Sequence, residues 1–345
     1  MPTDDTLALA ETTLGAPLDD PRDLGGSSRS RVLRCRTADR TVIVKHYLAD
    51  EGGHEREAVG LDLLDRTADL LARSGDGRLL VMSDLGPHPT LADLLLGADR
   101  EAAWAGARGW ARELGAMLAR SRSTVAEARR RLPHGPAGEA PFPVLERGLA
   151  NLARVLPGLD LAAIGAEFAG AAALLEPGPA DVLWPDDTCP DNAMLIDGRW
   201  WFLDLEGADV AHPALAAAFM VLPFASCWCV FDPPPGLTED LLAAFTDGLG
   251  TVGPNWRREV IDACAAYTMI NTGWFADRAI DGVPHVGPVG RGPSYRQLLT
   301  ARWRWGALNL RDDYPVLSAA LRDAGAWATD TWGLDAEPTG YPAFR

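Results

Sequence analysis

One lysine stands out among the residues that could do chemistry. Lys45 is the only lysine among 32 lysine and arginine residues, so arginine supplies every other basic side chain of these two types. Lys45 ends the strand-like run 41–45. A position that keeps lysine under this bias favours a compact ammonium over a planar guanidinium, as in a point-charge contact to phosphate or a Schiff base. The alternative is a chance survivor of the compositional bias.

A predicted hairpin carries a second group of polar residues. Two short apolar runs, 193–196 and 199–203, flank the Asp-Gly pair at 197–198, which is a strong signal for a two-residue turn. A hairpin brings its two ends together. We therefore expect Asn192, just before the first strand, to lie beside Asp204, just after the second.

The residue types at the ends of this hairpin indicate metal chemistry. An amide oxygen beside a carboxylate is suited to Mg²⁺, which takes few protein ligands and completes its shell with water and phosphate oxygens. Asn192 and Asp204 are therefore candidate Mg²⁺ ligands. Asp187, on the loop that leads into the hairpin, provides one more carboxylate and is a candidate base.

These residues carry a resemblance to a known family. A strand lysine, then Asp-x-x-x-x-Asn, a hairpin and a further Asp resemble the protein-kinase-like fold, and specifically the aminoglycoside phosphotransferase and choline kinase family. The resemblance implies that Lys45 holds the phosphates of ATP or GTP and that Asp187 is the catalytic aspartate. It also implies that Asn192 and Asp204 bind Mg²⁺.

Two further small-lobe features follow from the resemblance. The segment 24–32 resembles the glycine-rich turn over the nucleotide, with Ser27 and Ser28 as nucleotide-binding residues. The helical pattern over residues 54–64 offers Glu57 as the partner of the strand lysine. Glu55 competes, but two residues along a helix are about 200° apart, so only one of the two can face the sheet. We favour Glu57, because its neighbours match the family pattern.

The connector between the expected lobes follows a second hairpin. Residues 69–82 form two apolar runs around a Gly-containing turn. Under the resemblance, residues 83–86 are the connector, Met82 lines the back of the base pocket, the Ser83 carbonyl accepts a hydrogen bond from the base, and the Leu85 amide donates one. Met82 also fits an ordinary core position, and the two roles are compatible.

The sequence departs from the family pattern in three places. The catalytic loop of the family usually reads His-Gly-Asp, but here Pro185 and Asp186 precede the aspartate, so no histidine braces the loop. Glu206 stands where many relatives have a shorter second acid near the metal. The acid that usually follows the His-Pro pair is absent, because residues 212–216 continue with apolar side chains.

Composition narrows the class of protein. The formal net charge of −16 argues against a nucleic-acid partner. No apolar run is long enough for a membrane span, and the acidic first 30 residues do not fit a signal peptide, so we expect a cytoplasmic protein.

The cysteines are odd in number and scattered, which favours five reduced thiols. They are Cys35, Cys189, Cys227, Cys229 and Cys264.

These observations predict an α+β, two-lobe protein-kinase-like fold. Residues 1–86 are expected to form a small lobe with an antiparallel sheet and one helix, and residues 87–345 a helical lobe with the catalytic loop, the hairpin and the substrate site. Apolar spacing of three and four predicts a helix over 101–120. Four more helices are expected near 236–249, 256–281, 294–311 and 315–328.

The expected reaction is transfer of the γ-phosphoryl of ATP or GTP to a hydroxyl of a small molecule. An antibiotic of the aminoglycoside or nucleoside type, modified for self-resistance, is the leading hypothesis for the acceptor, and we expect a monomer or homodimer. A metabolite kinase for choline, an amino alcohol or a sugar is the main alternative. A kinase-like binding protein without activity is the third hypothesis. Most of the twelve tryptophans are expected to anchor helix packing, and a few could line the acceptor site.

Overall fold

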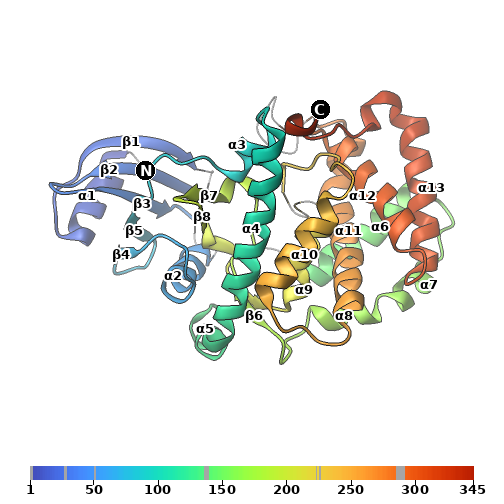
Figure 1. Ribbon diagram of the computed structural model, residues 1–345, viewed down its shortest axis with the longest axis horizontal. Coiled ribbons are helices and arrows are strands. Elements are labelled where there is room, and N and C mark those ends of the chain that lie inside the picture. The colour runs from blue at the N-terminus through green and yellow to red at the C-terminus, as the bar shows by residue number, and fades with distance from the viewer. Residues whose placement is uncertain are drawn as a thin grey trace.

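The computed structural model describes residues 3–26, 29–49, 52–135, 140–222, 224, 227–284 and 292–345. An antiparallel sheet with two helices forms one end of the molecule, and helices dominate the other end (Figure 1). We call the elements from α1 to β5 the small lobe and those from α3 onward the helical lobe. The long helix α4 stands where the two lobes meet (Figure 1).

The sheet of the small lobe places Lys45 on a central strand. Neighbouring strands all run antiparallel. Side chains alternate between the two faces of a strand, so Val42 and Val44 enter an apolar cluster on one face while Ile43 and Lys45 face the other. The strands are β1 (Asp19–Gly26), β2 (Ser30–Arg36), β3 (Thr41–Tyr47), β4 (Leu70–Arg73) and β5 (Leu79–Ser83), in the spatial order β1-β2-β3-β5-β4.

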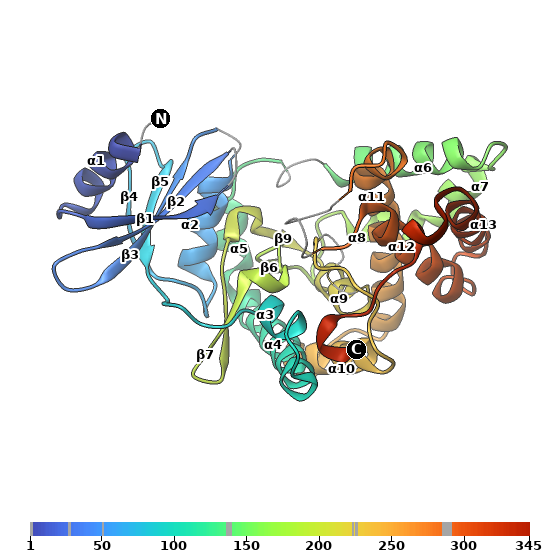
Figure 2. The ribbon, with the colours of Figure 1, turned by 90° about the horizontal axis from the view of Figure 1, so that it is seen from above.

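Helices cover both faces of this sheet (Figure 2). α2 (Gly53–Leu63) packs beside Tyr47 and Leu80 on the face that carries Lys45. α1 (Thr3–Leu14) packs its apolar side chains on the opposite face. The prediction of a single helix in this lobe is therefore wrong. α1 forms because its apolar residues recur at helical spacing and cover a sheet face that water would otherwise contact.

The helical lobe contains every long helix that the sequence predicts, within a few residues at each end. Capping defines some of these ends: the Ser294 hydroxyl accepts a hydrogen bond from the Gln297 amide at the start of α12. The helices are α3 (Leu91–Leu95), α4 (Arg100–Ser121), α5 (Val125–Arg131), α6 (Pro141–Val155), α7 (Leu161–Glu167), α8 (Ala169–Leu174), α9 (Pro213–Val221), α10 (Leu237–Leu249), α11 (Trp256–Ile280), α12 (Tyr295–Asn309) and α13 (Pro315–Trp332). Short 3₁₀ turns lie at Arg122–Thr124, Pro190–Asn192, Leu205–Gly207, Gly333–Ala336 and Pro342–Phe344.

Glycines allow α6 and α11 in this lobe to approach closely. A Cβ atom added to Gly148 of α6 would lie 2.2 Å from the Met269 carbonyl oxygen of α11. A Cβ atom added to Gly273 of α11 would lie equally close to the Val144 carbonyl oxygen of α6. Backbone therefore packs on backbone at this crossing, and no larger residue fits without moving a helix.

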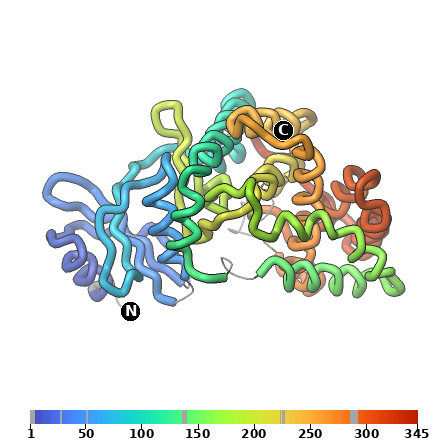
Figure 3. Tube along the Cα trace, turned by 90° about the horizontal axis from the view of Figure 1, so that it is seen from below, coloured from blue at the N-terminus to red at the C-terminus, as the bar shows by residue number. Residues whose placement is uncertain are grey.

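Two short ribbons position the loop that contains Asp187. β6 (Val182–Trp184) pairs with β9 (Asp209–Ala211), and β7 (Ala193–Ile196) pairs with β8 (Arg199–Phe202). The hairpin turn has positive φ at both central residues, 48° at Asp197 and 75° at Gly198, as the Asp-Gly pair predicts. In Figure 3 this hairpin is the yellow-green loop that projects at the top, between the small lobe and the helices.

Among the described residues, no helix combines the length and the apolar character that a bilayer crossing requires.

Candidate active site

A cleft of about 610 Å³ is lined by residues of both lobes. Ser27 and Ser28 lie outside the described residues. The other sequence-predicted site residues, which are separated by up to 159 positions, all line this one cleft. They are Lys45, Glu57, Met82, Ser83, Leu85, Asp187, Asn192 and Asp204.

Lys45 is buried in the cleft among three carboxylates. Its Nζ lies 2.5 Å from Asp204 Oδ1, 2.8 Å from Glu57 Oε2 and 3.3 Å from Glu206 Oε2. Burial alone would lower the pKa of Lys45, but the neighbouring acids outweigh it and hold the pKa well above the ordinary value. The raised pKa favours the charged ammonium, which suits a phosphate contact and does not suit a Schiff-base amine.

The predicted ion pair of Lys45 involves Glu57 rather than Glu55. The Glu57 side chain is buried, whereas Glu55 is partly exposed. Tyr47, two residues after the lysine on β3, donates a hydrogen bond from its hydroxyl to Glu57 Oε2. Burial is the largest influence on Glu57 and raises its pKa, although the Lys45 charge opposes this. Lysine and tyrosine together fix the glutamate at the back of the cleft.

The loop before the hairpin links Asp187 to Asn192. Asn192 Nδ2 donates a hydrogen bond to the Asp187 carbonyl oxygen at 3.3 Å. This contact leaves Asn192 Oδ1 as an acceptor for other groups. The Leu203 amide donates to the Asn192 carbonyl oxygen at 2.9 Å, so the end of β8 is tied to the start of β7. The hairpin thus brings Asn192 and the residues before Asp204 together, as the sequence predicts.

The Asp187 carboxylate lies in a strongly acidic setting. Burial raises its pKa to about 7, and the nearby negative charges of Asp204, Asp191 and Glu206 add to this effect. The Cys189 amide donates to Asp187 Oδ1 at 3.3 Å and opposes the shift. A carboxyl with a pKa near neutrality is suited to exchange a proton at physiological pH.

Asp204 and Glu206 approach the cleft from the turn after β8. Asp204 has a left-handed backbone, with φ of 57° and ψ of 63°, at the start of the 3₁₀ turn Leu205–Gly207. Glu206 contacts Lys45 and also accepts a hydrogen bond from Arg29, with 3.0 Å between Nη2 and Oε1. Glu206 therefore connects the β1–β2 turn region of the small lobe to the helical lobe.

The donor set at this point fits Mg²⁺. Asn192 Oδ1 and the Asp204 carboxylate are hard oxygen ligands on the two ends of one hairpin. The Lys45 ammonium, 2.5 Å from Asp204, shows that the cleft stabilises positive charge beside this carboxylate. The side chains of Asn192 and Asp204 therefore fit Mg²⁺, the ion that the resemblance implies.

The connector residues form the other end of the cleft. Met82 on β5 lies opposite Ile43 of β3 in the sheet register, and both line the cleft. Asp84 forms an ion pair with Arg34 of β2, with 2.8 Å between Oδ2 and Nε. Ser83 and Leu85 also line this end, next to apolar side chains. This end of the cleft carries the apolar side chains of Ile43, Met82 and Leu85 beside the Arg34–Asp84 ion pair.

Asp186 occupies a different environment from its neighbour Asp187. It lines a second pocket of about 420 Å³, together with Asp209, which pairs with Arg56 at 3.1 Å. Burial raises the pKa of Asp186 to about 7, with Asp187 and Asp209 adding to it and Arg56 opposing it. Tyr267 also lines this pocket. Burial raises the pKa of its hydroxyl well above the ordinary value, and the negative charges of Asp186 and Asp187 add to this effect. The aromatic side chains of the pocket are Phe142, Trp184, Tyr267 and Trp274.

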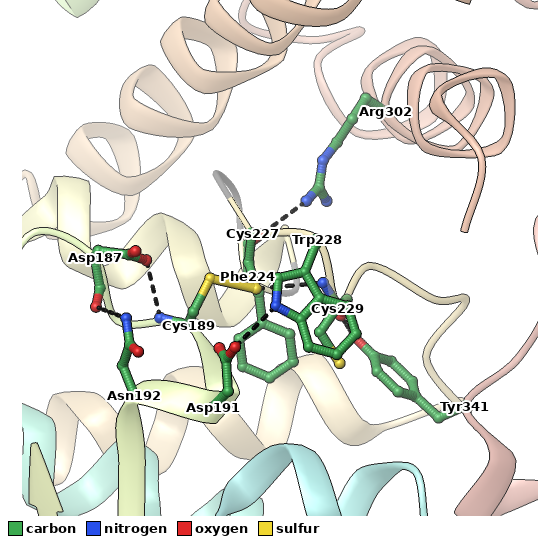
Figure 4. The surroundings of a disulfide bond; sticks show 10 residues. All are labelled: Asp187, Cys189, Asp191, Asn192, Phe224, Cys227, Trp228, Cys229, Arg302 and Tyr341. Atoms are coloured by element: carbon green, nitrogen blue, oxygen red, sulfur yellow. Dashed lines mark hydrogen bonds between the residues drawn. A yellow bond between two sulfur atoms is a disulfide. The ribbon is translucent and has the colours of Figure 1, made fainter. Parts of the chain in front are cut away.

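The structure corrects the expectation of five reduced cysteines. Cys189 and Cys227 form a disulfide, with 5.4 Å between their Cα atoms (Figure 4). The prediction failed because the two residues are 38 positions apart and only the fold brings them together. The other three cysteines, Cys35, Cys229 and Cys264, are buried thiols.

Sequence reasoning missed three residues around the cleft. Tyr47 follows Lys45 by two positions on a strand, so the shared face was a usable signal. Arg56 is buried and donates to the Ala208 carbonyl oxygen at 3.0 Å, but the sequence around it gives no signal for a buried charge. Nothing in the sequence pairs Arg29 with Glu206, because their contact depends on how the lobes meet.

Comparisons with known proteins were made for both sequence and structure. No protein-family model matches the sequence, and no curated protein sequence matches it significantly. A protein from Ralstonia eutropha assigned as an aminoglycoside phosphotransferase is 16% identical and has a TM-score of 0.56, with 95% of this chain and 98% of that chain covered. A choline/ethanolamine kinase family protein from Mesorhizobium loti is 17% identical and has a TM-score of 0.54, with 94% and 100% covered. A spectinomycin phosphotransferase solved with ADP and spectinomycin is 10% identical and has a TM-score of 0.52, with 93% and 98% covered.

These likenesses concern the fold, since the identities are low. Each alignment covers nearly the whole of both chains, so the small lobe and the helical lobe both belong to the shared architecture. The predicted two-lobe kinase-like fold is confirmed, and solved structures of aminoglycoside phosphotransferase and choline kinase type are among its structural neighbours.

Proposed function

We propose that this protein is a phosphotransferase that moves the γ-phosphoryl group of ATP or GTP to a hydroxyl of a small molecule. The observation that carries the proposal is the convergence of Lys45, Asp187, Asn192 and Asp204 in one cleft. These are the groups that phosphoryl transfer needs, because its catalysis consists mainly of positioning and charge stabilisation. The kinase-like fold supports the same conclusion.

In this proposal, nucleotide binds with its base at the connector end of the cleft. Met82 contacts the base, while the Ser83 carbonyl and the Leu85 amide hydrogen-bond to its edge. The phosphates lie at the other end, where Lys45 neutralises them and Glu57 keeps the ammonium in place. Ser27 and Ser28 belong to the turn that would cover the phosphates.

Asn192 and Asp204 would hold Mg²⁺ between them. When bound, the ion neutralises charge on the phosphate oxygens and aligns the γ-phosphoryl group for transfer. Asp204, which contacts Lys45 through Oδ1, would also keep the ammonium beside the phosphates.

Asp187 acts as the base. Its carboxylate orients the acceptor hydroxyl and takes the proton as the oxygen attacks the γ-phosphorus. A pKa of about 7 lets the carboxylate be ionised before the reaction and accept a proton during it. Asp186 lies in the adjacent pocket and has a supporting role.

The second pocket is our candidate for the acceptor site. It adjoins the catalytic loop, and its walls combine four aromatic side chains with the carboxylates of Asp186 and Asp209. Aromatic walls stabilise a ring by stacking, with about 1 kcal/mol beyond area burial, and carboxylates favour an amine. We infer that the acceptor is a hydroxylated antibiotic of the aminoglycoside or nucleoside type with a ring and a basic group. Self-resistance, in the cytoplasm where nucleotide is supplied, is the corresponding biological role.

The direct test incubates the protein with Mg²⁺, ATP or GTP, and a panel of hydroxylated antibiotics, and follows the products by mass spectrometry. The expected result is the gain of one phosphate on one member of the panel, absent with Asp187→Asn. Trp274→Ala should raise KM for that acceptor and leave KM for nucleotide unchanged. Phosphorylation of choline, an amino alcohol or a sugar instead would establish the metabolite-kinase alternative. Nucleotide binding without any transfer would favour the inactive binding protein.

A further inference from the structure

The disulfide lies inside the loop that carries the proposed base. Cys189 is two residues after Asp187 and three before Asn192, and Cys227 lies beyond α9 (Figure 4). Cys189 also contributes backbone contacts to both functional residues. Its amide donates to Asp187 Oδ1 at 3.3 Å, and its carbonyl oxygen accepts from the Asn192 amide at 2.9 Å. A change in the position of Cys189 would therefore move the base and the metal ligand together.

The other half of the disulfide belongs to a segment anchored in the helical lobe. The Cys229 carbonyl oxygen accepts a hydrogen bond from the Tyr341 hydroxyl at 3.0 Å, near the end of the chain. The Asp232 amide donates to the Thr339 carbonyl oxygen at 2.8 Å. Cys227 is thus attached to a well-packed part of the lobe, and the disulfide transmits that anchoring to the catalytic loop.

One non-covalent contact joins the same two segments. Trp228 Nε1 donates to Asp191 Oδ2 at 3.0 Å (Figure 4). This hydrogen bond would survive reduction, so the loop would be loosened rather than detached. Of this hydrogen bond and the disulfide, the disulfide is covalent and is the one that responds to redox conditions.

We propose that the Cys189–Cys227 pair is a redox modification site that controls the catalytic loop. In the oxidised form the loop is fixed in the arrangement described above, which is the active one. A dithiol reductant breaks the S–S bond, supplies two electrons and two protons to give two Cys thiols, and itself becomes a disulfide. Reduction then allows Asp187 to move away from the position needed for transfer. Disulfides in a reducing compartment are usually transient or redox-sensing, which agrees with this role.

The two disulfide cysteines are buried, and their burial has a second consequence. Cys189 and Cys227 are 6% and 1% exposed, so a reductant reaches them only when the loop or its neighbour opens. Mg²⁺-nucleotide bound to Asn192 and Asp204 would oppose such opening by holding the loop. Bound nucleotide should therefore slow reduction of the disulfide. The activity readout rests on the proposed function, whereas this protection readout needs only nucleotide binding.

The experiment compares oxidised protein with protein reduced by dithiothreitol and freed of reductant. Unfolding, alkylation and mass spectrometry should count three reactive thiols in the first and five in the second. The thiol count, but not the activity or protection assay, includes a chelator, because an Asp191 carboxylate oxygen lies within 4.8 Å of both sulfur atoms and a metal on two thiolates would mimic protection. We expect reduction to lower kcat on the order of 10-fold, since misplacing a catalytic group by about 1 Å has effects of this size or larger, with little change in KM for nucleotide. Reoxidation should restore kcat.

Variants separate the disulfide from the loop itself. Cys227→Ser removes the bond without changing the catalytic loop, and it should show the reduced kcat under all conditions. Cys229→Ser is the matched control and should keep both the disulfide and the response. Equal kcat for the two forms, or a redox response that persists in Cys227→Ser, would overturn the proposal. If no acceptor is found, the rate of reduction decides: Mg²⁺-ATP should slow it several-fold, and an unchanged rate despite measured nucleotide binding would also overturn it.

Discussion

Lys45 and Asp204 are 159 positions apart in the sequence, yet Nζ of the lysine lies 2.5 Å from Oδ1 of the aspartate. The contact joins the central strand of the small lobe to the turn after the hairpin of the helical lobe. Asp204 has a left-handed backbone at the start of this turn. The cleft thus pairs the two groups that, in the proposed function, would contact the phosphates and the metal.

Replacing Lys45 by arginine tests whether the site needs a compact ammonium. The guanidinium is planar and larger, and it cannot sit among the carboxylates of Glu57, Asp204 and Glu206 in the same way. Lys45→Arg should lower kcat/KM by about 100-fold or more while far-UV circular dichroism stays unchanged. Arg322→Lys, at an exposed ion pair, is the control and should have no effect. Near-normal turnover of Lys45→Arg would refute the phosphate assignment.

The division of labour between the aspartates can be tested by binding and turnover together. Asp187→Asn should abolish transfer but leave the affinity for Mg²⁺-nucleotide nearly unchanged, because the base acts in the transition state. Asp204→Asn should weaken that affinity as well, because it removes a metal ligand. Asp186→Asn should keep measurable activity. Isothermal titration calorimetry and steady-state kinetics are the measurements, and equal losses of affinity for Asp187→Asn and Asp204→Asn would contradict the assignment.

The pH dependence should report the proposed base. Asp187 must be ionised to act, and its pKa is about 7, so log kcat/KM should rise with unit slope below about pH 7 and level off above it. The neighbouring charge of Asp204 helps raise this pKa, and a metal bound there would cancel that charge. The pH profile of kcat reports the enzyme with substrates bound. Its midpoint should therefore lie at a lower pH than the midpoint of the kcat/KM profile. A flat kcat/KM profile between pH 5 and pH 7 would exclude Asp187 as the base.

The same raised pKa has a consequence for stability. Between the unfolded value of 3.8 and the folded value of about 7, the folded state binds more protons at Asp187 than the unfolded state does. Its contribution to stability is therefore full below about pH 4 and is lost as the pH rises through about 7. Asp187→Asn, which cannot ionise, should gain stability relative to the wild type over this range. Urea unfolding at pH 5 and pH 8 measures the change, and a difference of the opposite sign would mean that the carboxylate is stabilised by the fold.

The crossing of α6 and α11 should be intolerant of any added side chain. Gly148→Ala and Gly273→Ala each place a Cβ atom 2.2 Å from a backbone oxygen, so each should lower the free energy of unfolding by about 1–3 kcal/mol. Gly165→Ala in α7, where the added atom meets nothing within 4 Å, is the matched control and should be neutral or stabilising by up to about 1 kcal/mol. Thermal unfolding compares the three. Loss of stability in Gly165→Ala alone would contradict the packing described.

Local signals predicted the parts of the site that local rules determine. The Asp-Gly pair specified the hairpin turn, and the hairpin in turn brought Asn192 to Leu203, the residue before Asp204. Helical periodicity gave α4 and the last four long helices within a few residues. Helix geometry limited the lysine partner to one of Glu55 and Glu57, because two residues separated by about 200° cannot both face the sheet, and the resemblance to the family pattern then selected Glu57.

Contacts between lobes could not be predicted in this way. The Arg29–Glu206 pair and the Cys189–Cys227 disulfide each join distant segments, and no periodicity or turn rule relates them. The buried position of Arg56 depends on the approach of Asp209 from the helical lobe. Such contacts follow from how packed elements are placed, which is information that the whole fold supplies.

The position of Lys45 on β3 also determines how the chain responds to proteolysis. A protease that cleaves only after lysine has one target in the sequence, the bond between Lys45 and His46. That bond lies in a strand paired on both sides, with β2 and with β5. Cleavage into two fragments therefore requires the centre of the small lobe to open, and its rate measures the population of that opened state when opening is fast relative to cleavage. The protein thus contains a single-site reporter of small-lobe opening, without any labelling or mutation.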